Sequence, residues 1–205
     1  MKAVILGSGA SLKHYKSEDH AGAWVIGAND AIKSHKLNAF CCADTYQDIC
    51  LKRPIALTTP ANVEFWGRKN VGWEGWAKRR GNCNLVHTRR FNEFWDAKEL
   101  LRPDQHIHGY HTPFFCATVA IKKGFDELYF YGVDGDCFNV RNCYTVIKEL
   151  NALHEATKGV WLCEHSALWD ILNDEKCHTT LKGSSTKVRI KLNVNRAISP
   201  QLKGI

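Results

Sequence analysis

The chain has 205 residues, and its 44% hydrophobic content is enough to bury the core of one domain, which excludes a disordered chain. No apolar run reaches the roughly 18 residues that a membrane-spanning helix needs. The nine cysteines are an odd number without a CxxC pair, so we expect free thiols and a reducing, cytoplasmic compartment.

The first predicted strand, residues 2–6, leads into a glycine-rich turn that predicts an anion-binding loop. The absence of Cβ atoms lets backbone amides approach a phosphate, and the serines offer hydroxyl groups. Leu12 replaces the third glycine of a dinucleotide fingerprint, and no Gly-Lys-Ser/Thr follows. The alternative is a plain strand-to-helix turn. The loop residues expected to contact a nucleotide are Gly7, Ser8, Gly9 and Ser11.

Three further apolar segments predict short strands at residues 21–27, 37–43 and 54–58. Polar, helix-forming stretches separate them, which indicates a parallel sheet with crossover helices. Asn29 and Asp44 follow the first two of these strands. Each side chain would either contact a nucleotide or cap the next helix, and the sequence leaves both interpretations open.

Residues 61–105 are rich in tryptophan and arginine, and their glycines interrupt any long helix. We therefore expect a lid or insertion outside the core sheet. Its tryptophans would either stack on bases and sugar rings or form a small core of their own.

The second half of the chain returns to alternating helices and strands. The expected elements are a helix at 115–123, a strand at 128–133, a helix at 146–157 and a strand at 160–163. Residues 1–175 are thus predicted to form one α/β domain, a parallel sheet flanked by helices. Ligands of such sheets bind beyond the carboxyl ends of the strands.

Two aspartates, Asp134 and Asp136, follow the clearest of these strands. They could hold a divalent ion such as Mg²⁺ or Mn²⁺ on a nucleotide diphosphate, which would indicate pyrophosphoryl or nucleotidyl transfer. Alternatively, Asp134 caps a turn and Asp136 is solvated. His106, His108 and His111 lack a completing cysteine or carboxylate, so they predict a polar loop beside the cleft rather than a metal site.

The tail, residues 176–205, contains no Asp or Glu, and its seven lysines and arginines account for the whole net charge of +7. It would be either a solvated arm or a docking arm for an anionic membrane surface or nucleic acid. The docking alternative adds two hypotheses: a protein peripheral on a membrane, and a nucleic-acid-binding or nucleic-acid-modifying protein.

Three segments, VILGSGASL, VIGANDA and HTPFFCATVAIKKGFDELYFYGVDGD, resemble a known family. They are similar to bacterial sialyltransferases that modify lipooligosaccharide and to the related motility-accessory-factor glycosyltransferases. The likeness covers about residues 1–60 and 105–172. The positions of the third segment that match the family pattern are Ala120, Gly124, Phe125, Glu127, Leu128, Tyr129, Gly132 and Asp134.

The resemblance implies a Rossmann-like sheet that binds a sugar nucleotide (a CMP- or NDP-sugar) and transfers the sugar to a glycan or other hydroxyl acceptor without requiring a metal. It implies nucleotide contacts at Thr112 and Gly132 as well as at the loop and Asn29. The complete predicted nucleotide site comprises Gly7, Ser8, Gly9, Ser11, Asn29, Asp44, Thr112, Gly132 and Asp134.

The chain departs from the family where catalytic groups are expected. The family's Thr-Ser-Gly is His-Thr-Pro here, and its phosphate-binding tyrosines fall near Asp136 and Asn142. By the resemblance, the general-base histidine should lie shortly before the helix predicted to begin at Val146, and no histidine is found there. We therefore expect His111, or else His154, to act as the general base, and Arg141 to stabilise the departing phosphate.

Overall fold

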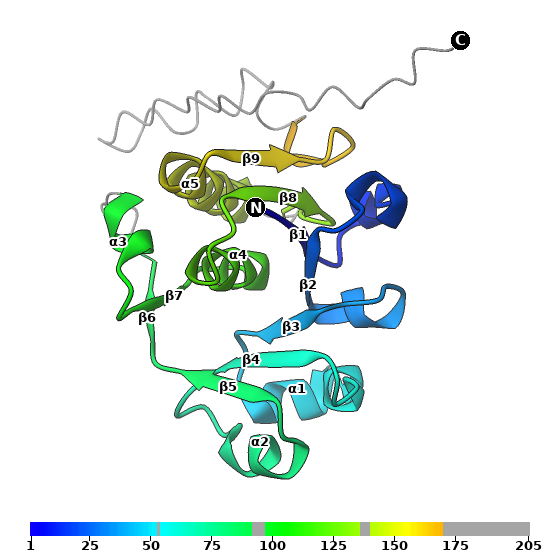
Figure 1. Cartoon of the computed structure of the whole chain (residues 1–205), viewed down its shortest axis with the longest axis vertical. Coiled ribbons are helices and arrows are strands. Elements are labelled where there is room, and N and C mark those ends of the chain that lie inside the picture. Colours follow the sequence, from blue (N-terminus) through cyan, green and yellow to red (C-terminus); the bar gives the residue numbers. More distant parts are fainter. Residues whose placement is uncertain (53, 92–96, 136–139, 170–205) are drawn as a thin grey trace.

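The computed structural model describes residues 1–52, 54–91, 97–135 and 140–169 (Figure 1). The main sheet consists of β1 (Lys2–Leu6), β2 (Trp24–Ala28), β3 (Ala39–Cys42), β4 (Glu64–Arg68), β5 (Cys83–Val86), β8 (Glu127–Tyr131) and β9 (Gly159–Leu162). A second sheet pairs β6 (Thr88–Arg90) with β7 (His106–His108). The α-helices are α1 (Tyr46–Lys52), α2 (Glu74–Arg80), α3 (Ala97–Leu101), α4 (Thr112–Lys122) and α5 (Val140–Ala156). Four 3₁₀ helices are η1 (Ala10–His14), η2 (Ser17–His20), η3 (Asn29–Lys33) and η4 (Pro54–Thr58).

The main sheet has the order β5-β4-β3-β2-β1-β8-β9, and every neighbouring pair of its strands is parallel. Strand β1, which lies between β2 and β8 in the interior of the sheet, is fully buried from Ala3 to Leu6. Parallel strands covered on both faces need such continuous apolar runs, and such runs in the sequence predicted β1, β2, β3, β8 and β9. The predicted α/β fold, a parallel sheet flanked by helices, is confirmed.

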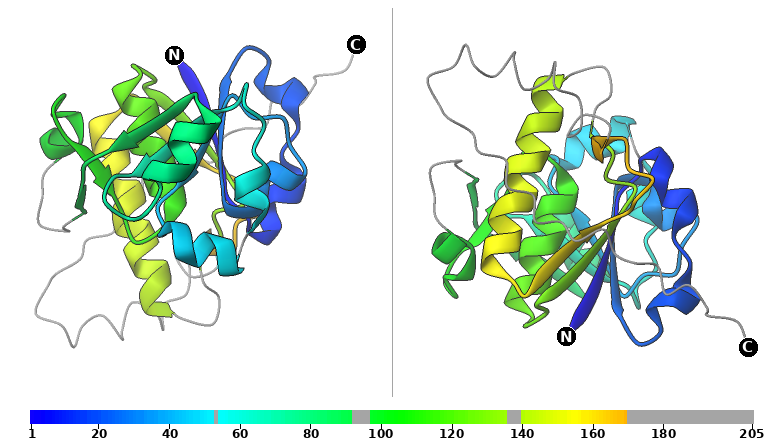
Figure 2. Two further views of the ribbon diagram at one scale, coloured as in Figure 1. Left: turned by 90° about the horizontal axis from the view of Figure 1, so that it is seen from below. Right: turned by 90° about the horizontal axis from the view of Figure 1, so that it is seen from above.

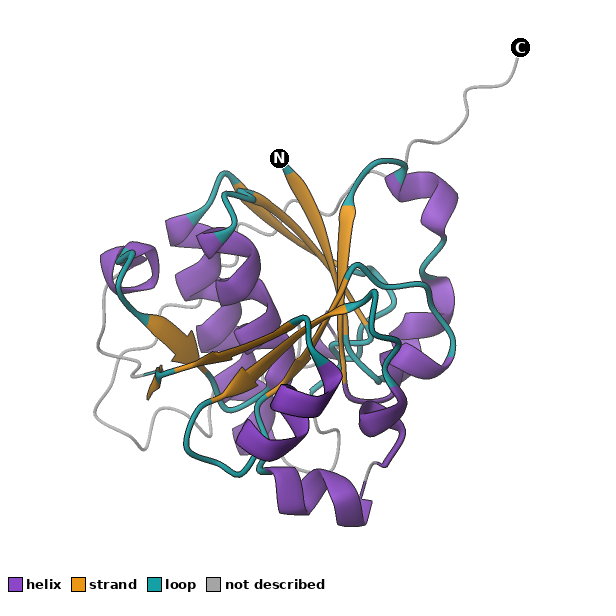
Figure 3. Ribbon diagram, turned by 60° about the horizontal axis from the view of Figure 1, so that its bottom comes forward, coloured by secondary structure: helices purple, strands orange, loops and turns teal. Residues whose placement is uncertain are grey.

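Helices cover both faces of the sheet (Figures 2 and 3). The apolar sides of α4 and α5 pack with one set of strand side chains into a single cluster, which includes Phe115, Ile147 and Phe130. On the opposite face, α1, α2 and the 3₁₀ helices η1 and η3 pack against residues such as Phe40 and Phe65. The sheet therefore separates two cores. The predicted helices and strands of the second half are confirmed, with α4 and α5 beginning earlier than expected.

The predicted strand at residues 54–58 is wrong, because this segment forms the 3₁₀ helix η4. Pro54 begins the segment, and a proline lacks the N–H that a strand inside a sheet must donate. The strand next to β3 is instead β4, ten residues later, with Phe40 paired to Phe65.

The expectation that residues 61–105 lie outside the core sheet is wrong for their first half. Strands β4 and β5 extend the main sheet, and Trp73 is fully buried against Phe65, with ring centroids 4.9 Å apart. Trp73 and Trp76 pack onto one face of this sheet instead of forming a separate core. Only the later part, with β6, α3 and β7, lies outside the main sheet, beside α4 and α5.

All seven cysteines within the described residues are free thiols, as expected. None of the described helices is long and apolar enough to cross a membrane. Asp136 and the basic tail 176–205 lie outside the described residues, and their roles stay predictions.

Candidate functional site

The residues predicted to bind a ligand gather at the carboxyl edge of the main sheet. The glycine-rich loop follows β1, and the segment from Gly132 to Asp134 follows the neighbouring strand β8. Helix α4 ends just before β8 begins, so its first residue, Thr112, lies at the same edge. Edges of this kind are where open α/β sheets bind ligands.

The glycine-rich loop is bound to the end of β8 by a continuous set of hydrogen bonds. The N–H of Gly9 donates to the carbonyl of Gly132 at 2.8 Å, and the N–H of Gly132 donates to Ser11 Oγ at 2.9 Å. The N–H of Ser11 donates to Asp134 Oδ2 at 2.8 Å, and that of Gly7 to the carbonyl of Tyr131 at 2.8 Å. Hydrogen bonds thus join two loops that lie more than 120 residues apart in the sequence.

Close packing explains the glycines of this loop. A Cβ atom at Gly7 would lie 2.3 Å from the carbonyl oxygen of Gly132, and one at Gly9 would lie 2.2 Å from Asp134 Oδ2. The prediction that the amides of Gly7, Gly9 and Ser11 are open to a phosphate is wrong, because all three have protein partners. Ser8 is exposed and keeps its hydroxyl available to a ligand.

Asp134 is the buried acid that joins these two loops. Its Oδ2 atom accepts the N–H of Ser11 at the start of η1, a contact between two segments that are distant in the sequence. The interpretation that Asp134 caps a turn of its own segment stays a prediction. Its Oδ1 atom is buried without a hydrogen-bond partner in the described structure. Within residues 1–52, 54–91, 97–135 and 140–169, no three His, Cys, Asp or Glu side chains are grouped so as to hold a metal ion. The metal pair of Asp134 with Asp136 stays a prediction.

Replacing Asp134 by alanine is expected to destabilise the fold by about 1–3 kcal/mol, because the buried N–H of Ser11 would lose its acceptor. Asp134→Asn keeps an acceptor oxygen and should lose less. Urea unfolding of the two variants checks the order of their losses in stability, and equal losses would contradict it.

The metal prediction is tested separately by titrating Mg²⁺ or Mn²⁺ into the wild type and into the double variant Asp134→Asn, Asp136→Asn. Unchanged metal affinity in the double variant would contradict the metal prediction.

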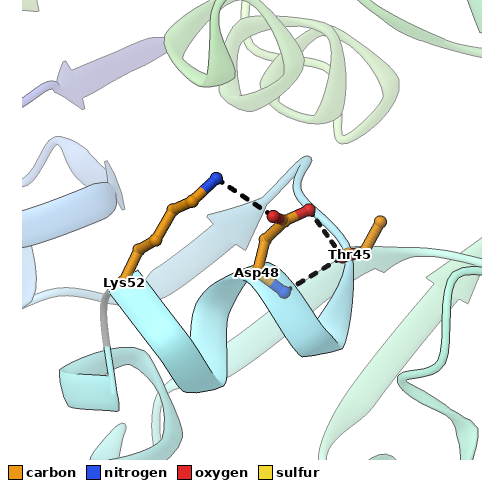
Figure 4. Close-up of polar contacts among 3 residues, drawn as sticks. All are labelled: Thr45, Asp48 and Lys52. Carbon is orange, nitrogen blue, oxygen red and sulfur yellow. Dashed lines mark hydrogen bonds and ion pairs between the residues drawn. The ribbon is translucent and has the colours of Figure 1, made fainter.

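The residues that follow β2 and β3 take part in local backbone structure and in capping. Asn29 adopts a left-handed conformation, with φ 55°, as it begins η3. The carbonyl of Asp44 accepts a 3.0 Å hydrogen bond from Trp73 Nε1. Thr45 caps α1: its Oγ1 accepts from the N–H of Asp48 at 3.1 Å and donates to the same residue's carboxylate at 2.7 Å (Figure 4). These contacts leave the nucleotide interpretation of Asn29 and Asp44 as a prediction.

His111 has a buried acidic partner that sequence reasoning missed. It is the N-cap residue of α4, and its Nδ1 atom lies 3.7 Å from Glu149 Oε2 on α5. Glu149 is only 2% exposed, and its Oε1 atom accepts the N–H of Tyr110. The signal was a glutamate within the apolar stripe of the predicted helix, where an acid needs a partner. A separation of 3.7 Å is longer than a hydrogen bond, but contacts of this kind often tighten when substrate binds.

The environment of Glu149 favours its neutral form. Burial raises the pKa of the Glu149 carboxyl, and the contacts with His111 and with the Tyr110 N–H act in the opposite direction. Apolar side chains of α4, β8 and α5 line a small cavity beside the pair, including Phe114, Phe130 and Val146. A carboxylate that holds an imidazole from behind in an apolar setting is an arrangement found in general-base catalysis.

His154, the alternative base predicted from the sequence, is not brought to His111. His154 lies in the last turn of α5, which places it about 7 Å farther along the helix axis than Glu149, toward the amino edge of the sheet. The side chain of Arg141 lies outside the described part of the structure. His106 and His108 belong to strand β7 instead of the expected loop.

Comparisons with known proteins bear on the fold. No family model matches the sequence, and no curated protein matches it. The structure is similar to the sialyltransferase CstII from Campylobacter jejuni in complex with CMP-3FNeuAc, with a TM-score of 0.53 and 18% identity over 82% of this chain and 83% of that chain. A CstII complex with a trisaccharide acceptor and CMP gives a TM-score of 0.54 and 17% identity over 83% and 84%.

The monofunctional alpha-2,3-sialyltransferase Cst-I from Campylobacter jejuni gives a TM-score of 0.53 and 13% identity, over 82% of this chain and 78% of that chain. Identities this low establish a shared fold and nothing finer. The chain therefore has a sialyltransferase-like α/β fold.

Proposed function

We propose that this protein is a glycosyltransferase that binds a CMP-activated sugar at the carboxyl edge of its sheet and transfers the sugar to a hydroxyl of a glycan. The observation that carries the proposal is the pairing of His111 with buried Glu149 at the first turn of α4. The similar fold of CstII, whose structures include CMP and a trisaccharide acceptor, supports the choice of donor and acceptor.

In the proposed reaction, one pair of residues acts on the acceptor hydroxyl and another pair binds the phosphate of the donor. His111 takes the proton of the acceptor hydroxyl as its oxygen bonds to the sugar carbon, and Glu149 stabilises the imidazolium that forms. The bond from that carbon to the phosphate oxygen breaks, and CMP leaves with the electron pair. The hydroxyl of Ser8 and the guanidinium of Arg141 are the groups that we assign to the phosphate.

Incubation of the full chain with a panel of nucleotides and sugar nucleotides tests the proposal. We expect CMP and a CMP-sugar to raise the melting temperature more than the NDP-sugars do, and the CMP-sugar to be hydrolysed slowly without an acceptor. A ligand at 100 times its Kd stabilises the folded state by about 2.7 kcal/mol, which a melting experiment resolves. The absence of any shift with every nucleotide would refute the proposal.

A further inference from the structure

Three basic side chains gather at the ends of strands β4, β6 and β7. Arg68 is the last residue of β4, Arg90 of β6 and His108 of β7. Strands β6 and β7 are parallel, and their register sets Arg90 directly opposite His108. We call these three residues the basic cluster.

Strand β7 turns its histidines toward β4. The ring of His106 contacts the ring of Trp66, with centroids 5.7 Å apart. Side chains two residues apart on a strand share a face, so His108 is directed toward Arg68 in the same way. The electrostatics agree: burial lowers the pKa of His108 to about 4, and the charges of Arg68 and Arg90 contribute to the lowering.

The arginines of the basic cluster carry charge that no described carboxylate neutralises. Among the described residues, Arg68 and Arg90 form no ion pair, whereas Arg102 pairs with Glu99. One N–H of Arg68 is fixed by the carbonyl of Ala43 at 3.1 Å, and its Nε atom is buried without a partner. The two guanidinium charges repel each other and disfavour protonation of the His108 imidazole. A bound oxyanion would offset this repulsion by accepting charge-assisted hydrogen bonds from these groups.

The basic cluster adjoins the proposed base. The guanidinium of Arg90 lies 5.6 Å above the ring of Tyr110, and that ring is 5.4 Å from the ring of His111. Strands β3 and β2 separate β4 from β1, so the cluster is set apart from the glycine-rich loop, where we assign the donor. An anion held by the cluster would therefore belong to the molecule on the acceptor side of His111.

We propose that Arg68, Arg90 and His108 form an oxyanion subsite, and that the acceptor carries a carboxylate or phosphate that occupies it. The subsite itself follows from the basic cluster alone. Its assignment to the acceptor rests on the proposed function, because that assignment depends on His111 acting as the base.

The subsite is tested by titrating the full chain with inorganic phosphate at pH 7 and following the imidazole resonances of His108 by NMR. We expect a saturable change in these resonances and a rise in the pKa of His108. Arg90→Gln should weaken phosphate binding at least about tenfold. Arg102→Gln, which changes an exposed and already paired arginine, is the matched control and should leave binding unchanged. Resonances that do not move, or that move equally in Arg90→Gln, would overturn the subsite.

The acceptor assignment is tested with three matched sugars: methyl glucoside, glucuronate and glucose 6-phosphate. With CMP present, we expect one or both charged sugars to bind at least about tenfold more tightly than the neutral one, and Arg90→Gln to remove the difference. The stronger binder identifies the oxyanion as carboxylate or phosphate. Equal binding of all three sugars, or displacement of phosphate from His108 by CMP, would overturn the assignment. If phosphate binds but CMP does not bind to the protein, the subsite stands and the proposed function fails.

Discussion

Replacing His111 by glutamine is expected to lower the rate of sugar transfer by about 10²–10⁴-fold, because the acceptor hydroxyl would lose its general base. The folded state should be little affected, since the His111 side chain makes no capping hydrogen bond to α4. CMP binding should also be unchanged, because the nucleotide is assigned to the loop beyond β1. Steady-state kinetics with a CMP-sugar, together with the Kd for CMP, separates the loss of catalysis from a loss of binding.

Two further variants refine this result. Glu149→Gln keeps an acceptor for the Tyr110 N–H but removes the charge behind His111, so it should also slow transfer. Because burial raises the pKa of Glu149, wild-type activity should increase with pH as this carboxyl ionises above its ordinary value, and Glu149→Gln should lack that increase. His154→Gln is the matched control and should retain full activity. If His154→Gln loses activity while His111→Gln keeps it, the assignment of the base is wrong.

Replacing Gly7 by alanine is expected to destabilise the fold by about 1–3 kcal/mol or to prevent folding. The added Cβ would lie 2.3 Å from the carbonyl oxygen of Gly132 and 3.3 Å from Val133 Cγ2. The nearest neighbour is backbone, so relief requires separating β1 from β8 near the sheet centre. Urea unfolding measures the loss, and the melting temperature should fall by about 2–4 °C for each kcal/mol.

Gly75→Ala is the control for the glycine experiment. Gly75 lies in α2, and the nearest atom to an added Cβ is Arg79 Nη1, at 3.7 Å. Alanine there should stabilise the protein by about 0.5–1 kcal/mol through helix propensity. Unfolding of Gly7→Ala at the wild-type urea concentration would show that the loop can move away from β8.

Periodicity located the buried elements and failed where polar and aromatic residues were mixed. Strands such as β1 and β8 are recognisable because burial on both faces demands unbroken apolar runs. Strand β4 was missed because its sequence, EFWGR, turns Phe65 to one core and Glu64 and Trp66 to the opposite face. The tryptophans, mixed charges and glycines of residues 61–105 predicted an insertion instead.

The candidate site was only partly predictable for a related reason. The chain order shows that the glycine-rich loop and Asp134 follow strands, but not that Ser11 and Asp134, 123 residues apart, form a hydrogen bond. Glu149 and His111 are 38 positions apart on different helices, and nothing local in the sequence pairs them.

The sequence by itself determined the parallel α/β sheet, and it predicted the edge at which we expect a ligand and His111 as the leading candidate for the base. These depend on local apolar patterns and on the rule that strand ends meet at one edge. Only the tertiary structure decided that the loop glycines pack against β8, that Glu149 lies behind His111, and that Arg68 and Arg90 converge on His108. Packing and charge act between segments distant in the chain, so their consequences become visible only when the strands and helices are placed together.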